Sequence, residues 1–121
     1  PSIIPIPNVP IKTKKTYPNG DKYEGYMLND KPHGIGTMRY SDGEYYTGEW
    51  NNNKYVKGTK EYKNGTTYKG TWINNQYDTG KLTFLSDEDY KSFEGTFLNN
   101  NDANGTLIYV NGNKYTGELP L

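Results

Sequence analysis

The chain contains no cysteine, one histidine and one arginine among its 121 residues. The absence of cysteine excludes disulfides, thiolate nucleophiles and cysteine-based metal sites. It also fits a reducing compartment, so we expect a cytoplasmic protein. The one histidine, His33, has no second histidine or cysteine with which to bind a metal or form a catalytic pair. We therefore expect no cofactor and no enzymatic activity, and we assign His33 a structural role in a turn.

The chain also lacks an excess of charge of either sign. Fourteen Lys and Arg residues balance fourteen Asp and Glu residues, so no net field attracts nucleic acid or an anionic membrane. Lysine outnumbers arginine 13 to 1, which leaves little capacity for bidentate phosphate recognition. No apolar run approaches the roughly 18 residues of a membrane span. The first residue is Pro1 and no signal peptide follows, which indicates a processed or excised piece.

Aliphatic side chains are scarce, because hydrophobic residues make up only 31% of the chain and aromatic residues alone make up 15%. Thirteen tyrosines can bury large rings while each keeps a hydroxyl in water. The apolar material is therefore concentrated in rings. This composition suits a thin, extended fold better than a globule with a deep core.

A five-residue motif recurs along the chain. Tyr46-Thr47-Gly48-Glu49-Trp50 returns as Tyr68-Lys69-Gly70-Thr71-Trp72. Looser copies begin at Tyr23, Phe93 and Tyr115. The central glycines of the five copies are separated by 23, 22, 25 and 22 residues. A fixed period of this length is the signature of a repeat architecture.

Turn signals divide each repeat into two strands. Asn-Gly or Asp-Gly stands shortly before four copies of the motif, at 19–20, 42–43, 64–65 and 111–112. This dipeptide predicts a two-residue hairpin turn with positive φ at both positions. A second series of glycines, at 36, 58, 80 and 105, begins the second strand of each repeat. Asparagine-rich turns, such as 51–53, 74–75 and 99–101, join the two strands.

Side-chain alternation then assigns the faces of the strands. Tyr46, Gly48 and Trp50 share one face, whereas Thr47 and Glu49 lie on the other. Glycine inside a strand marks a bend, so we expect the sheet to curve toward the aromatic face. Nine strands would form a ribbon of about 40 Å. The acidic turn at 87–89 is interpreted as solvated, because no complete calcium-binding loop surrounds it.

Residues 1–16 differ from the repeats, since four prolines alternate there with aliphatic residues. The prolines favour an extended course. We interpret 1–16 as an N-terminal strap along the first repeat that hides an edge strand. The alternative is a tail that lies in a groove or recruits a partner. Residues 17–121 then form the repeat array, with four full repeats and the first strand of a fifth.

The stretch from Tyr23 to Gly43, which contains His33-Gly34 and ends in Asp42-Gly43, resembles the MORN repeat (membrane occupation and recognition nexus). The resemblance covers residues 17–119, although 55–57, 77–79 and 102–104 replace the His-Gly element in later units, where they would lie in turns. It implies an all-β fold: an elongated, single-layer antiparallel sheet of tandem β-hairpins, curved into a half-pipe with an aromatic concave groove. It also implies a scaffold or adaptor role. Some members hold helices or helical peptides, and phospholipid binding has been proposed for the family.

We expect a non-enzymatic protein-interaction module or scaffold that receives a peptide or helix in the aromatic groove. The predicted groove residues are Tyr23, Tyr46, Trp50, Tyr62, Tyr68, Trp72, Phe84, Phe93 and Phe97. The competing interpretation is that these rings stack on one another and form the only hydrophobic layer.

Three further functional alternatives remain open on the sequence. A homodimer could form through the C-terminal edge strand, Tyr115–Leu119, because this strand lacks its hairpin partner. A phospholipid surface could bind the basic residues Lys12, Lys14 and Lys15. The chain could also be the regulatory segment of a larger enzyme. We expect no nucleic-acid partner.

Overall fold

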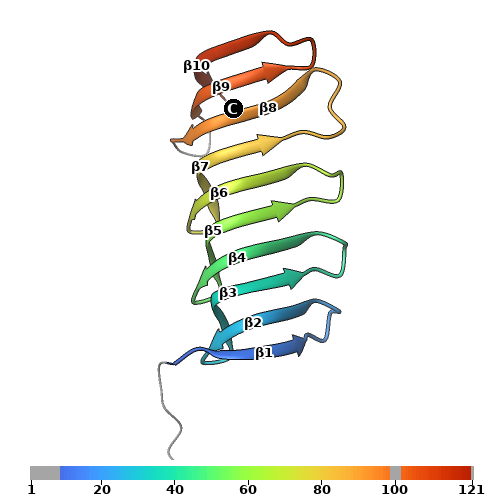
Figure 1. The fold of residues 1–121 in the computed structure, drawn as a ribbon, viewed down its shortest axis with the longest axis vertical. Coiled ribbons are helices and arrows are strands. Elements are labelled where there is room, and N and C mark those ends of the chain that lie inside the picture. Colours follow the sequence, from blue (N-terminus) through green and yellow to red (C-terminus); the bar gives the residue numbers. More distant parts are fainter. Residues whose placement is uncertain (1–8, 99–101, 121) are drawn as a thin grey trace, which may run out of the picture.

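The computed structural model describes residues 9–98 and 102–120, and these form one antiparallel sheet in which each strand pairs with the next along the chain. The strands are β1 (Ile11–Thr16), β2 (Lys22–Leu28), β3 (Lys31–Arg39), β4 (Tyr45–Asn51), β5 (Lys54–Glu61), β6 (Thr67–Ile73), β7 (Gln76–Thr83), β8 (Tyr90–Phe97), β9 (Asp102–Tyr109) and β10 (Lys114–Pro120). Figure 1 shows them stacked like rungs along one axis. The expected all-β sheet of tandem hairpins is confirmed. In the described ranges no helix is long and apolar enough to cross a membrane.

The sheet has ten strands, so the expectation of nine was wrong. The additional strand is β1, which pairs with β2 from Ile11↔Met27 to Thr16↔Lys22. Proline is absent from 11–16, so every residue there can donate to the ladder. These six residues of the predicted strap therefore lie along the edge of the first repeat. Residues 1–8 lie outside the described part of the chain, and the strap and tail interpretations stay predictions for them.

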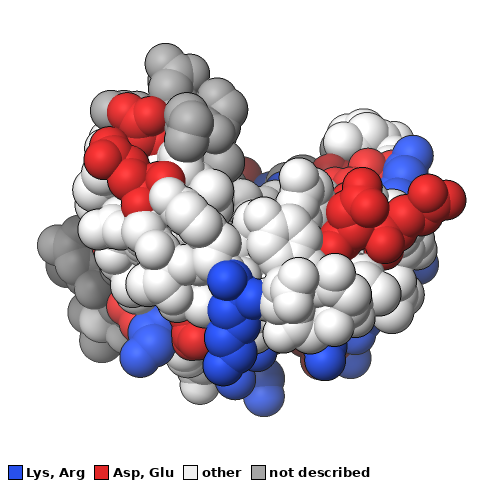
Figure 2. All heavy atoms as spheres, turned by 90° about the horizontal axis from the view of Figure 1, so that it is seen from above, with Lys and Arg blue, Asp and Glu red and all other residues white. Residues whose placement is uncertain are grey.

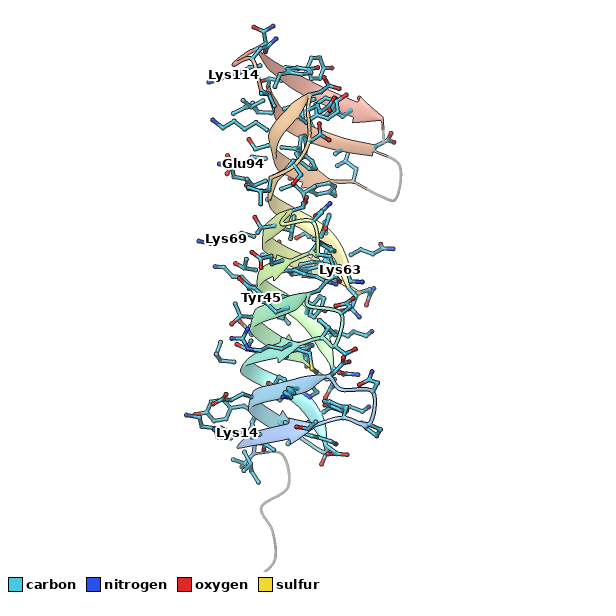
Figure 3. The ribbon with its side chains drawn as sticks, turned by 90° about the vertical axis from the view of Figure 1, so that its right-hand side faces the viewer. Lys14, Tyr45, Lys63, Lys69, Glu94 and Lys114 are labelled. Carbon is cyan, nitrogen blue, oxygen red and sulfur yellow. The ribbon has the colours of Figure 1, made fainter. Side chains whose placement is uncertain are left out.

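A line of paired glycines crosses the sheet from β2 to β10. Each glycine of the line lies opposite a glycine of the neighbouring strand, as in Gly36↔Gly48 and Gly48↔Gly58. The backbones approach so closely that a Cβ on Gly48 would lie 2.4 Å from the Lys57 carbonyl oxygen and 2.6 Å from the Gly58 Cα. Only glycine fits such an approach. Figure 3 shows the strands curving around the long axis of the sheet, and Figure 2 shows the resulting hollow end-on. The predicted half-pipe is confirmed.

The Asn-Gly and Asp-Gly turns are not the two-residue turns that the sequence predicted. In the turn between β3 and β4 the Gly43 amide donates to the Tyr40 carbonyl, and the Tyr40 amide donates to the Glu44 carbonyl. Only Gly43 has a positive φ, of 96°, whereas Asp42 does not. This is a three-residue loop, a type I turn followed by one left-handed residue. Asp42 favours it because its carboxylate accepts a hydrogen bond from the Glu44 amide.

The two-residue turns lie at the other ends of the strands, where a polar turn joins the two strands of one repeat. Three such turns have positive φ at both residues. Asn52 and Asn53 have φ angles of 47° and 69°, and Asn74 and Asn75 have 50° and 62°. Asn51 pairs with Lys54 directly across the first of these turns. Asparagine tolerates the left-handed region better than most residues do. The third predicted asparagine turn, at 99–101, lies outside the described residues.

The core is a single layer of side chains on the concave face. Among the described residues, ten hydrophobic side chains are buried: Tyr23, Met27, Met38, Tyr46, Trp50, Tyr68, Trp72, Phe93, Ala103 and Leu107. They form two clusters, a larger one over β2–β6 and a smaller one over β8 and β9, and Leu82 and Phe97 pack against both. A one-layer sheet has no second sheet to cover this face, so the rings must cover one another.

Candidate functional site: the concave aromatic groove

The structure places most of the predicted groove residues beneath the surface of the groove. Tyr23, Tyr46, Trp50, Tyr68, Trp72 and Phe93 are buried, with exposed fractions between 0 and 6%. Tyr62, Phe84 and Phe97 are half-buried. The six buried rings are therefore core residues that a partner cannot touch in this conformation. They pack edge-on against one another, as Tyr46 does against Trp50 and Tyr68 against Trp72.

Two tyrosines that the sequence analysis did not assign to the groove cover the buried rings. The ring of Tyr55 stacks on that of Tyr46 with centroids 3.9 Å apart, and Tyr77 stacks on Tyr68 at the same distance. Strict alternation from Gly58 would turn Tyr55 to the convex face. A register shift between Glu49 and Trp50 instead places Tyr55 opposite Trp50 on the concave face. Side-chain alternation cannot predict this bulge, so it assigned Tyr55 to the wrong face.

A signal for these rings was nevertheless present in the sequence. Tyr55 and Tyr77 are separated by 22 residues, which equals two of the spacings between the motif glycines. Both lie in strands, β5 and β7, and 102–104 lie in β9, so the assignment of 55–57, 77–79 and 102–104 to turns was wrong. Pro32, at the same place in the first repeat, is fully buried opposite Met27. The position is therefore a third core position of the repeat.

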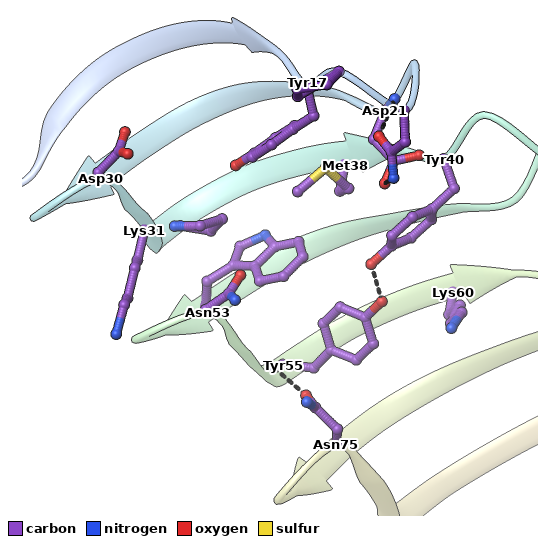
Figure 4. A pocket seen from close by; sticks show the side chains of 14 residues that line it. Tyr17, Asp21, Asp30, Lys31, Met38, Tyr40, Asn53, Tyr55, Lys60 and Asn75 are labelled. Atoms are coloured by element: carbon purple, nitrogen blue, oxygen red, sulfur yellow. Dashed lines mark hydrogen bonds between the residues drawn. The ribbon is translucent and has the colours of Figure 1, made fainter.

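Hydroxyl pairs join neighbouring repeats across the groove surface. The hydroxyl of Tyr40 hydrogen-bonds that of Tyr55, and Tyr62 is joined to Tyr77 in the same way. Figure 4 shows the first of these pairs. Burial raises the pKa of Tyr55 and of Tyr77, and the hydrogen bond to the neighbouring phenol raises it further. Both phenols therefore stay neutral, and these two pairs present rings and polar hydroxyls at the groove surface.

The buried tyrosines use their hydroxyls inside the fold. The Tyr46 hydroxyl donates to the Glu49 carbonyl oxygen at 2.8 Å, and the Tyr68 hydroxyl donates to the Thr71 carbonyl at 2.9 Å. Each bond reaches over the glycine of its own motif. Burial raises the pKa of Tyr46 and Tyr68 to about 12. These hydroxyls hold the bend of the strand and are not available to a ligand.

Two neighbouring hollows lie in the groove that the described residues form. The first, of about 720 Å³, lies over the first three hairpins and is lined by Tyr17, Met38 and Tyr40 among others (Figure 4). The second, of about 570 Å³, is lined by Tyr62, Ile73 and Leu98 among others. Tyr55, Lys60 and Asn75 line both hollows. The groove is thus continuous, and these shared residues lie where the two hollows meet.

Lys60 brings a positive charge to this meeting point. Its ammonium group lies 5.0 Å from the ring centroid of Tyr62, 5.4 Å from that of Tyr55 and 5.6 Å from that of Tyr40. These are cation–π distances. Viewed along the long axis, most acidic side chains lie on the two arms beside the hollow, whereas lysines gather on the opposite, convex side (Figure 2). Asp21, Asp30 and Lys31 also line the first hollow, and Asp78 lines the second, so Lys60 is the charged residue that lines both.

The other residues that the sequence singled out have structural roles. His33 lies in β3 rather than in a turn, and its Nδ1 accepts a hydrogen bond from the Asn52 amide at 3.1 Å. The Asp87 carboxylate accepts hydrogen bonds from the Asp89 and Tyr90 amides, which lower its pKa. Within the described ranges no cluster of three or more His, Asp or Glu side chains could hold a metal ion.

Comparison with known proteins identifies the repeat. A family model described as "MORN repeat" matches residues 23–45, 46–67, 68–78 and 93–114. A curated protein, "Phosphatidylinositol 4-phosphate 5-kinase 1" of Oryza sativa subsp. japonica, is 46% identical over 39 residues. This alignment covers 32% of the present chain and 5% of that protein. The similarity to the kinase is thus confined to a short stretch and leaves most of that protein unmatched.

Proposed function

Because the chain belongs to the MORN repeat family, we propose that it is a non-enzymatic interaction module that binds a peptide or a single helix of a partner protein in its concave groove. The observation that carries the proposal is the row of half-buried rings above the core, namely Tyr40, Tyr55, Tyr62 and Tyr77. Aromatic side chains of this kind dominate the binding energy of protein interfaces.

The rigidity of these rings supports the proposal. Tyr55 and Tyr77 are each fixed by a stacked ring below and a hydroxyl partner beside them. A partner that binds there immobilises few side chains, so little of the contact energy is lost to ordering. The rings also combine an apolar face with a polar hydroxyl, which suits an amphipathic segment.

The experiment that tests this function uses two exposed isoleucines on opposite faces. Ile73 lines the second hollow and is 58% exposed, whereas Ile35 lies on the convex side beside Gly48 and is 63% exposed. Short peptides are selected from a random phage-displayed library on the intact chain, and their affinities are then measured for Ile73→Glu and Ile35→Glu. We expect Ile73→Glu to weaken binding about tenfold or more. Ile35→Glu is expected to leave binding unchanged, and both variants should keep the circular dichroism spectrum of the parent.

Equal affinity of the selected peptides for all three proteins would place their binding outside the groove and contradict the proposal. A library that yields no peptide above background would contradict it as well, because the groove would then lack the expected binding energy.

A second candidate, binding of an anionic phospholipid surface, is favoured by a basic cluster on the convex face. Lys22 lies directly opposite Arg39 in the sheet, and both line a shallow hollow together with Lys14. The carboxylate of Glu24 lies 3.9 Å from the Lys14 ammonium group. Like charges directly opposite each other destabilise a sheet, so a ligand that neutralises them would recover that energy. The name of the matched kinase also refers to an inositol lipid.

Vesicle co-sedimentation decides this second candidate. We expect binding to vesicles with anionic lipid at low salt, and loss of that binding in a Lys22→Ala/Arg39→Ala variant. The variant Lys57→Ala/Lys81→Ala, which removes two lysines elsewhere on the convex face, is the control. Equal binding of both double variants to the vesicles would contradict the lipid proposal. Failure of the parent chain to bind any vesicle would contradict it as well.

Two further functions, self-association and a regulatory role, are supported by fewer observations. The outer edge of β10 has no neighbouring strand among the described residues, and Tyr115 is 42% exposed there. We therefore retain self-association through this edge as a proposal, to be checked by light scattering of the intact chain over a range of concentrations. A regulatory role beside a catalytic domain rests on the short match to the kinase alone, and we favour it less than the groove.

A further inference from the structure

Lys60 occupies a position that the other repeats fill with an apolar side chain. It is the second residue after the inner glycine of its repeat, Gly58, and it pairs with Tyr46 on one side and Tyr68 on the other. The equivalent residues of the other repeats are Met38, Leu82 and Leu107. Met38 and Leu107 are buried. A lysine in a row of core residues is unusual, because the core itself gains nothing from its charge.

The surroundings of Lys60 hold its position but do not neutralise it. Three tyrosine rings lie within 5.6 Å of its ammonium group. The ion pairs among the described residues are Lys14–Glu24 and Lys15–Asp30, so Lys60 has no carboxylate partner there. Ring faces attract a cation, but they are weak acceptors for the three N–H groups of an ammonium. These donors are free for an acceptor that enters the groove.

The groove extends on both sides of this cation. The two hollows meet at Lys60 and Tyr55. The half-buried rings of Tyr17 and Tyr40 line the first hollow, together with Asp30 and Lys31. Leu82 and Phe97, also half-buried, line the second. Figure 4 shows Lys60 beside the Tyr40–Tyr55 pair, at the end of the first hollow. The groove therefore presents aromatic and aliphatic side chains on either side of Lys60 along its axis.

We propose that the groove selects a partner segment that places one carboxylate on the Lys60 ammonium and one apolar side chain in each of the two hollows beside it. This inference rests on the proposed groove function and specifies the chemistry of the partner. The carboxylate is an aspartate or glutamate side chain of a peptide segment. Charge-assisted hydrogen bonds from the ammonium would fix the register of the segment along an otherwise repetitive groove.

The repeat distance sets the spacing of the three groups. One repeat contains two strands, which span about 9.6 Å across the sheet. Seven residues of a helix rise about 10.5 Å. A helix along the groove would thus carry apolar residues at i and i+7, with the acidic residue near the middle.

The test compares peptides selected on the parent chain with peptides selected on Lys60→Met. Methionine is the residue of the equivalent position Met38, so this variant is expected to fold at least as stably as the parent. The probe is the random phage-displayed peptide library itself. We expect peptides from the parent to be enriched in one Asp or Glu between two apolar residues, and peptides from Lys60→Met to lose the acidic residue while they keep the apolar pair.

A double-mutant cycle measures the contact directly. A selected peptide and its Glu→Gln version are titrated against the parent, Lys60→Met, Lys60→Arg and the convex control Lys69→Met. We expect Glu→Gln to weaken binding to the parent at least about tenfold, because hydrogen bonds to charged groups are strong. The same change should have little effect on binding to Lys60→Met. Lys60→Arg should keep much of the preference for Glu, and Lys69→Met should behave as the parent does.

The outcomes separate this inference from the function on which it rests. Selected peptides that need Ile73 but show no acidic enrichment would overturn the role of Lys60 and leave the groove function intact. Equal effects of Glu→Gln on the parent and on Lys60→Met would do the same. Peptides that bind independently of Ile73 would overturn both.

Discussion

The ring of Tyr46 lies under the ring of Tyr55, with centroids 3.9 Å apart and planes inclined by 17°. Tyr46 is fully buried although the sheet has only one layer, because the next strand supplies the ring that covers it. Tyr68 and Tyr77 repeat the arrangement one hairpin later. The protein thus builds a core from pairs of stacked rings where a globular fold would use a second layer of secondary structure.

Removal of the covering ring is expected to destabilise the whole array. Tyr55→Ala should lower the free energy of unfolding by about 3 kcal/mol, because it exposes Tyr46 and loses contacts with two tryptophans. Tyr55→Phe should cost about 1 kcal/mol, since it loses only the hydroxyl pair with Tyr40. Urea denaturation followed by tryptophan fluorescence measures both changes. Tyr26→Ala is the control, because Tyr26 is 42% exposed; a Tyr55→Ala cost no larger than the control would contradict the covering role.

An alanine substitution should destabilise the fold more at a glycine of the paired line than at a glycine in a turn. A Cβ on Gly58 would lie 2.4 Å from the Thr47 carbonyl oxygen, so the strands must separate. We expect Gly58→Ala to cost about 2 to 3 kcal/mol. Gly43 has open space around it and a φ of 96°, so Gly43→Ala should cost only about 1 kcal/mol of backbone strain. Thermal and urea unfolding of both variants tests this order, and the reverse order would show that steric contact does not set the requirement for glycine.

The tyrosine hydroxyl that bonds across the motif glycine is expected to stabilise the fold more where it is more deeply buried. Tyr46→Phe should cost about 1 kcal/mol, because the Glu49 carbonyl loses its donor in a buried place. Tyr115 makes the equivalent bond to the Glu118 carbonyl at 2.9 Å but is 42% exposed. Water can replace that hydroxyl, so Tyr115→Phe should cost less than about 0.5 kcal/mol. The comparison requires only equilibrium unfolding curves, and equal costs would mean that burial does not govern the bond.

Stability is expected to fall in alkali. The pKa of Tyr23, Tyr46 and Tyr68 is raised by burial from 10.0 to about 12. Below pH 10.0 these tyrosines are protonated in both states, so their contribution is fully present. Between pH 10.0 and about 12 the unfolded chain loses these protons and the folded chain keeps them. The free energy of unfolding should therefore fall by up to about 1.4 kcal/mol per pH unit for each tyrosine.

Circular dichroism and tyrosinate absorbance, recorded together during a titration with base, measure this effect. Loss of sheet signal and ionisation of the buried tyrosines should coincide. Tyr68→Phe should flatten the pH dependence, since one of the shifted groups is then absent. Ionisation of all tyrosines in a chain that keeps its sheet spectrum would contradict the expected linkage.

The amino-acid sequence alone determined the order of the hairpins and the shape of the sheet. The motif glycines recur at 23, 22, 25 and 22 residues. A glycine at the same place in each strand from β2 to β10 can only produce a line of close approach when these strands pair in order. The choice of an aromatic and a charged face followed from alternation. Tyr46, Trp50, Tyr68 and Trp72 were thereby assigned to the concave face, where the structure has them.

The tertiary structure alone decided which rings form the core and which form the surface of the groove. Tyr55 and Tyr77 reach the concave face because bulges shift the register after Glu49 and Gly70, and a bulge reverses the alternation on which a sequence argument depends. It also decided that Lys60 lies among three rings without a carboxylate partner in the described parts of the chain. Burial is a property of neighbouring strands rather than of one residue. The sequence could therefore predict a row of rings but not which of them remain within reach of a partner.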